Sequence, residues 1–165
     1  MKGFRAIAAC WLLGCALGGL SGCEGEQTLL STGDSFDLDE PQWLVVNYWA
    51  EWCGPCRHEI LELNELNAQS TAQPLVVLGV NYDGLHNEKL DAVISRMGIE
   101  FPVLEDDPRE RWLQSLPTVL PTTFIIDADG GLRESLVGPQ TRAGILERIS
   151  HYSGAGADDG KVAAE

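Results

Sequence analysis

Residues 49–56 read Trp-Ala-Glu-Trp-Cys-Gly-Pro-Cys, and this stretch decides the fold of the 165-residue chain. Two cysteines separated by two residues can close a small disulfide if the first lies at the start of a helix and the second one turn further on. A helix N-terminus also stabilises negative charge, so Cys53 is expected to ionise more readily than a free thiol. The pattern predicts that Cys53 is an exposed nucleophile and that Cys56 is a buried resolving thiol.

The segments on both sides fit a strand, a turn and a helix. Residues 43–49 form a β-branched and aromatic run after Pro41, which predicts a buried strand. From Pro55 to about Asn67, apolar residues recur at spacings of three and four, which predicts a helix directly after the strand.

The same two patterns alternate through the rest of the chain. Further strands are predicted at residues 75–80, 122–127 and 132–137, and further helices at 88–97, in a short stretch after Pro108, and at 141–152. The order implies an α/β fold with a mixed central sheet flanked by helices. We assign residues 41–152 to this domain, 23–40 to a tether, and the small polar residues 153–165 to a disordered tail.

The N-terminus has the layout of a bacterial export signal. Lys2 and Arg5 precede an apolar run over residues 6–20, and the run ends in Leu-Ser-Gly before Cys23. This ending resembles the lipobox of bacterial lipoproteins, which implies a signal peptide over residues 1–22 and acyl chains on Cys23 that anchor the protein to a membrane. An ordinary secretory signal or an uncleaved anchor are the alternatives.

Cysteine count and charge narrow the possible functions. Of five cysteines, only Cys53 and Cys56 remain in the folded domain once the signal and the anchor are set aside, so no disulfide framework holds the fold. Without residues 1–22 the chain keeps 9 basic against 25 acidic residues, a net charge of −16. Such a surface argues against nucleic acid as a partner and against docking on anionic lipid. A solubilising acidic face is the simpler explanation.

The motif resembles the active site of thioredoxins, and its surroundings resemble the TlpA/ResA family of membrane-tethered thiol-disulfide oxidoreductases. Asn47 stands where cytoplasmic thioredoxins carry a buried Asp, and Glu59 matches the active-site carboxylate of the tethered family. Residues 98–103 (Gly-Ile-Glu-Phe-Pro-Val) resemble a mid-domain signature of that family, and residues 120–127 (Leu-Pro-Thr-Thr-Phe-Ile-Ile-Asp) resemble its cis-proline strand. Two features depart from that family: Leu61 stands where it usually has a proline, and we expect its N-terminal hairpin to be shortened here to residues 34–41.

The resemblance implies a thioredoxin-like fold with a strand-helix insert between the CxxC helix and the cis-proline strand. It implies no cofactor or metal beyond the redox-active disulfide. The resemblance also implies the site residues. Those for catalysis are Cys53, Cys56 and Glu59, and those for substrate contact are Trp52, Gly54, Pro55, Leu120 and Pro121.

Each assignment has a simpler alternative. The cysteines could form a structural disulfide or half of a zinc site, although the chain has no second CxxC. Glu59 could be a solvated helix carboxylate like Glu62, and Pro121 could be an ordinary trans proline.

The expected function is reduction of protein disulfides outside the cytoplasm, in the bacterial periplasm or on the cell-envelope exterior. Gly-Pro between the cysteines resembles reducing thioredoxins, and a membrane thiol relay would then supply electrons. The family suggests apocytochrome c or a copper-site protein as partners. A Cu(I) chaperone that binds the ion through Cys53, Cys56 and His58 is the alternative function.

Overall fold

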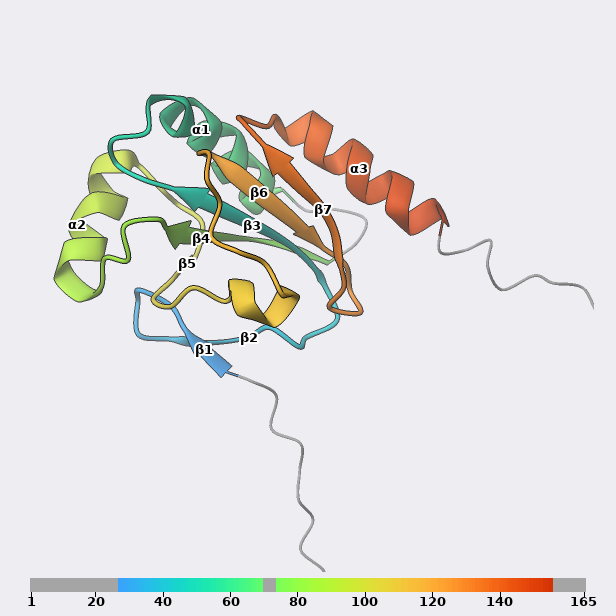
Figure 1. Ribbon diagram of the computed structural model, residues 1–165, viewed down its shortest axis with the longest axis horizontal. Helices are drawn as coiled ribbons and strands as arrows, with labels where there is room; N and C mark the ends of the chain where they lie inside the picture. The colour runs from blue at the N-terminus through green and yellow to red at the C-terminus, as the bar shows by residue number, and fades with distance from the viewer. Residues whose placement is uncertain (1–26, 70–73, 156–165) are drawn as a thin grey trace, which may run out of the picture.

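The computed structural model describes residues 27–69 and 74–155, and the regular elements within them alternate as the sequence predicts (Figure 1). In chain order they are β1 (Gln27–Leu29), β2 (Ser35–Asp37), β3 (Trp43–Trp49), α1 (Gly54–Ala68), β4 (Leu75–Asn81), α2 (Asn87–Met97), β5 (Val103–Leu104), the 3-10 turn η1 (Arg109–Trp112), β6 (Thr122–Ile126), β7 (Leu132–Val137) and α3 (Arg142–Ala155).

A five-stranded mixed sheet forms the centre of the domain, in the order β5-β4-β3-β6-β7. β3 pairs in parallel with β4 and antiparallel with β6, and Asn47 lies opposite Thr123 in the second pairing. All seven residues of β3 are buried, as the continuous apolar run predicts. The predicted α/β thioredoxin-like fold with a mixed sheet is confirmed.

Two apolar layers cover the faces of the sheet. Alternate residues of β3 such as Val45 and Trp49 pack with α1, α2 and α3, in a cluster that also contains both cysteines. The intervening residues, such as Val46 and Tyr48, pack under η1 and the β1-β2 hairpin. Figure 1 shows α1 and α3 on one side of the sheet and the hairpin on the other.

The hairpin corrects part of the sequence analysis. Residues 23–40 are predicted to be a tether, and the family's hairpin is predicted to be shortened to 34–41, whereas β1 and β2 pair over Gln27–Asp37. These strands have three residues each, too few for a periodic signal. They are held by tertiary bonds to the sheet edge, from the Ser31 N–H to the Val103 carbonyl (2.8 Å) and from the Glu105 N–H to the Leu29 carbonyl (2.9 Å).

The chain forms β4, α2, β5 and η1 between α1 and β6. The strand-helix insert expected between the CxxC helix and the cis-proline strand falls within this part of the chain. α2 ends where predicted, at Gly98, whose φ of 67° is left-handed. α3 continues to Ala155, past the predicted end at residue 152. The predicted signal peptide, Cys23 and most of the predicted tail lie outside the described residues. Within residues 27–69 and 74–155, no helix is long and apolar enough to cross a membrane.

Candidate functional site

A disulfide joins Cys53 and Cys56 at the junction of β3 and α1. Cys53 is the N-cap of α1, and its Sγ accepts a hydrogen bond from the Cys56 N–H (3.2 Å). Pro55 fits the first turn of the helix because that turn needs no N–H from it. The helix N-terminus therefore faces the sulfur of Cys53, where it favours negative charge.

The exposure of Cys53 differs from the prediction. Cys53 is 4% exposed and Cys56 is 0% exposed. In the disulfide, Cys53 packs with Cys56 inside the cluster formed with α1, which covers most of the sulfur. The order of accessibility is as expected, because Cys53 remains the more accessible of the two, and Gly54 and Pro55 beside it are exposed.

Trp52 forms part of the rim next to Cys53. The residue is 66% exposed, and its Nε1–H donates to both carboxylate oxygens of Asp83, at 3.1 Å each. Tyr82 packs edge-on against it, with ring centroids 6.1 Å apart. A large apolar side chain exposed but fixed in this way can contact a partner without losing much conformational freedom.

The loop before Cys53 is tied to α2. The guanidinium of Arg96 donates to both carboxylate oxygens of Glu51, at 2.6 and 3.0 Å, and this lowers the pKa of Glu51. Arg57 donates to the Glu51 carbonyl at 2.7 Å. These contacts are exposed and add little stability, but they define the path of the chain into the motif.

Leu120 and Pro121 precede β6, and the peptide bond between them is cis, as predicted. Pro121 is buried, and its carbonyl accepts from the Gly138 N–H at 2.9 Å. Leu120 is half-buried and packs against both apolar clusters, one of which contains the cysteines. Within the described part of the chain, the backbone N–H and carbonyl of Leu120 have no hydrogen-bond partner.

Glu59 is buried, with 2% of the residue exposed, so the solvated alternative is wrong. Three donors surround its carboxyl group: Asn47 Nδ2 to Oε2 (2.9 Å), the Gln140 N–H to Oε1 (2.9 Å) and Thr123 Oγ1 to Oε1 (3.4 Å). Burial raises the pKa of Glu59, and the three hydrogen bonds oppose that rise. Glu59 lies one helical turn beyond Cys56, on the same face of α1.

Sequence reasoning identified Glu59 and Asn47 but missed Thr123 and Gln140. Thr123 could have been found, because a strand at residues 122–127 beside the first strand places one of its side chains opposite Asn47. Gln140 acts through its backbone N–H, which does not depend on the type of side chain and so cannot be recognised in the sequence. Asn47 also donates to Thr123 Oγ1 at 3.0 Å, and its own Oδ1 is buried without a partner.

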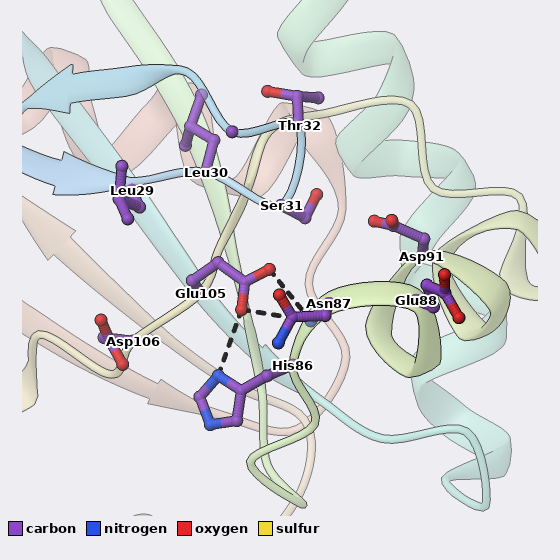
Figure 2. A pocket seen from close by; sticks show the side chains of 11 residues that line it. Leu29, Leu30, Ser31, Thr32, His86, Asn87, Glu88, Asp91, Glu105 and Asp106 are labelled. Carbon is purple, nitrogen blue, oxygen red and sulfur yellow. Dashed lines mark hydrogen bonds and ion pairs between the residues drawn. The ribbon is translucent and has the colours of Figure 1, made fainter.

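A separate surface hollow of about 470 Å³ lies between the hairpin and the start of α2. Figure 2 shows Glu105 at its centre, with its carboxylate directed at His86 and at the start of α2. It accepts from the Asn87 N–H at 3.2 Å and lies 3.1 Å from His86 Nδ1. Glu105 therefore caps α2, and none of the predicted site residues lines this hollow.

Among residues 27–69 and 74–155, no three or more His, Cys, Asp or Glu side chains gather where they could bind a metal. His58, the third ligand of the copper alternative, is an exposed residue of α1.

Comparison with known proteins assigns the chain to a family. The model of the AhpC/TSA family matches residues 24–135. The chain belongs to the AhpC/TSA family. Among known proteins, the thiol-disulfide oxidoreductase ResA of Geobacillus thermodenitrificans is 30% identical over 106 residues, which cover 64% of this chain and 60% of the relative. A homologue of the thiol:disulfide interchange protein DsbE from Paracoccus denitrificans is 36% identical over 131 residues, or 76% of this chain and 68% of the relative.

A solved structure agrees on the fold. The crystal structure of StoA from Bacillus subtilis superposes with a TM-score of 0.60 at 19% identity, over 78% of this chain and 95% of that one. The predicted membership of the ResA/TlpA type of thiol-disulfide oxidoreductases is confirmed. The chain spans 60% of the length of the ResA relatives from two Geobacillus species.

Proposed function

We propose that this AhpC/TSA family protein is an extracytoplasmic thiol-disulfide oxidoreductase that reduces disulfides in partner proteins. The observation that carries the proposal is the Cys53–Cys56 disulfide at the N-terminus of α1, one helical turn from a buried carboxyl group. The disulfide corresponds to the oxidised state, which a reductase reaches after it has delivered two electrons.

The reaction starts from the reduced pair. The Cys53 thiolate attacks one sulfur of the partner disulfide, that S–S bond breaks, and the departing partner thiolate takes up a proton. The Cys56 thiolate then attacks Cys53 Sγ in the mixed disulfide. This step forms the Cys53–Cys56 bond, releases the second partner thiol after protonation, and leaves the partner reduced by two electrons.

Glu59 supports the second step as a proton acceptor. Cys56 must lose its proton before it can attack, and it is 0% exposed, so bulk water has poor access to it. Because burial raises the pKa of Glu59, the carboxylate takes up a proton at a pH closer to neutral than an exposed glutamate does. The shared face of α1 places the two groups on the same side of the helix.

The partner contacts the rim formed by Trp52, Gly54, Pro55 and Leu120, and the buried Pro121 orients Leu120 through the cis peptide bond. The unpaired backbone groups of Leu120 suit an extended segment of the partner, which would add to this edge as a strand does. The exposed indole of Trp52 supplies apolar contact area beside Cys53.

The direction of electron flow, the partner proteins and the cellular location are proposed from the sequence and the family resemblance. The Gly-Pro dipeptide supports a reducing role, which requires a membrane thiol relay as electron donor. Apocytochrome c and a copper-site protein are the proposed partner types, by resemblance to the family. The export-signal pattern of residues 1–22 supports an extracytoplasmic location, with lipidated Cys23 as the anchor.

The test is insulin reduction by the full chain, with dithiothreitol as the electron source. Cys53→Ser should abolish the activity, whereas Cys23→Ser, the matched cysteine control, should retain it. Turnover by Cys53→Ser at the parent rate would exclude the proposed chemistry.

Equilibration with glutathione tests the direction of electron flow, because it measures the reduction potential of the Cys53–Cys56 pair. A reductase should have a potential near the thioredoxin value of about −270 mV, and a potential near about −120 mV would assign the protein as an oxidase instead.

Incorporation of a radioactive fatty acid tests the anchor separately. The parent chain should take up label in bacterial cells and Cys23→Ser should not. Label retained by the variant would remove Cys23 as the acylated residue.

A further inference from the structure

Glu59 is one of two carboxylates on α1 that bind the segment leading into α3. Glu59 Oε1 accepts from the Gln140 N–H, and Glu62 Oε2 accepts from the Arg142 N–H, both at 2.9 Å. The carboxylates are three residues apart, which places them one turn apart on one face of the helix. The two N–H groups are two residues apart, on either side of Thr141. The segment is therefore held at two successive points along α1.

The Glu62 contact has the features of a helix cap supplied by another helix. Arg142 is the first residue of α3, so its N–H has no partner within that helix. A carboxylate at this end is favoured by the helix dipole. Another N–H of this first turn, that of Gly144, donates to Thr141 Oγ1 (3.2 Å). Glu62 is half-buried against this end of α3, which distinguishes it from a solvated carboxylate such as Glu65.

We propose that Glu62 is a positioning residue for the active site, which fixes the start of α3 and thereby keeps the Gln140 N–H on Glu59. The segment between the two contacts is short: only Thr141 separates Gln140 from Arg142. Release of the Arg142 N–H therefore frees the Gln140 N–H to move away from the carboxyl of Glu59. The inference deepens the proposed function, because it assigns control over the same carboxyl group.

The electrostatic surroundings of Glu59 make the effect measurable. Its hydrogen-bond partners from β3, β6 and the segment before α3 are all uncharged: Asn47, Thr123 and the Gln140 backbone. The titratable groups on its own helix face are Cys56, here in the disulfide, and Glu62. Across from it, the Arg142 guanidinium pairs with Glu65 at 3.5 Å. The Gln140 hydrogen bond is foremost among the contacts that lower the pKa of Glu59 against the effect of burial.

The test compares three variants of the full oxidised chain. Glu62→Gln keeps an oxygen that can accept from the Arg142 N–H but removes the charge. Glu62→Ala removes both, so the difference between these two variants isolates the hydrogen bond. Glu65→Ala is the control, because it removes an exposed carboxylate that pairs with the side chain of Arg142 and not with its backbone N–H.

Two readouts are taken by NMR. The carboxyl carbon of Glu59, assigned by its absence in Glu59→Gln, is titrated with pH, and exchange of the Gln140 amide hydrogen with solvent is timed. Glu62→Ala should titrate at higher pH than Glu62→Gln, and its Gln140 amide should exchange at least about tenfold faster, as expected for a lost hydrogen bond. Glu65→Ala should match the parent chain in both.

Equal titration midpoints and equal exchange rates in the alanine and glutamine variants would overturn the inference. That result would leave the proposed function intact, because the insulin assay on Cys53→Ser decides the function independently. Conversely, failure of the insulin assay would leave the NMR comparison valid as a statement about the carboxyl group of Glu59.

Discussion

Replacing Asn47 by leucine tests whether the carboxyl group of Glu59 is held as the structure shows. Asn47 Nδ2 donates both to Glu59 Oε2 (2.9 Å) and to Thr123 Oγ1 (3.0 Å), and the residue is fully buried in the central strand. Leucine has nearly the same branched shape, so the substitution removes the donor and leaves little cavity.

The expected cost follows from the two hydrogen bonds. A bond to an ionised group contributes about 1.5–3 kcal/mol and a neutral one about 0.5–1.5 kcal/mol. Part of the loss is offset, because Asn47 Oδ1 is buried without a partner and its removal relieves about 1–3 kcal/mol. With Glu59 ionised, Asn47→Leu should lower the free energy of unfolding by about 1–2 kcal/mol.

The stability lost in Asn47→Leu should increase as pH rises. The Asn47 bond lowers the pKa of Glu59, so the variant holds the Glu59 proton to higher pH than the parent chain does. The folded variant thus binds more protons than the folded parent, and its stability falls more steeply as pH rises. The extra cost begins as pH rises through the pKa of Glu59 in the parent fold, which lies above the ordinary value of 4.5, and is complete once pH exceeds the still higher pKa of Glu59 in the variant. At lower pH both lost bonds are neutral ones, and the cost should approach zero.

Urea unfolding of the oxidised full chain, followed by tryptophan fluorescence at about pH 4 and about pH 8, measures both values. The control is Asn64→Leu. Asn64 also makes two hydrogen bonds, with the Gly98 carbonyl (2.8 Å) and the Glu100 N–H (2.9 Å), but no carboxylate is involved. The control should therefore lose the same stability at both pH values. An Asn47→Leu cost that does not shrink on acidification would refute the described contact with an ionised Glu59.

Three further substitutions probe the site. Glu59→Gln should slow resolution of the mixed disulfide by about 10²-fold near pH 7, measured by rapid acid quenching, and an unchanged rate would remove Glu59 as proton acceptor. Gly79→Ala should cost about 1–3 kcal/mol in urea unfolding, because a Cβ there would lie 2.9 Å from Trp49 Nε1, and a stable variant would contradict the packing of β4. Trp52→Ala should raise the KM for a protein substrate while small-molecule disulfide reduction and stability stay near parent values, since Trp52 is 66% exposed and its indole bonds the exposed Asp83 and packs against Tyr82. An unchanged KM would exclude Trp52 from the partner surface.

The sequence predicts the central elements well because their signals are local. The apolar run of residues 43–49 becomes β3 with the same bounds, and α2 ends at Gly98 because a left-handed residue is needed there. The β1-β2 hairpin carries no such signal, since its strands are short and depend on bonds to the edge strand β5.

In the candidate site, too, some features follow from local sequence and others depend on tertiary contacts. The CxxC spacing is enough to expect the disulfide, and the motif around Pro121 is enough to expect the cis bond. The sequence alone cannot decide whether Glu59 is buried or solvated. That depends on Thr123 and the Gln140 backbone, which lie 64 and 81 residues away in sequence. The small exposure of Cys53 likewise depends on packing across the closed disulfide.

The central claim, that Cys53 attacks and Cys56 resolves, is tested most directly by trapping. The full chain with Cys56→Ser, expressed in bacterial cells and isolated after acid quenching, should accumulate a mixed disulfide, and mass spectrometry should locate it at Cys53 and identify the partner. The reciprocal Cys53→Ser variant should accumulate none. Capture through Cys56 in the Cys53→Ser variant, with nothing bound to Cys53 in the Cys56→Ser variant, would contradict the proposed order of attack.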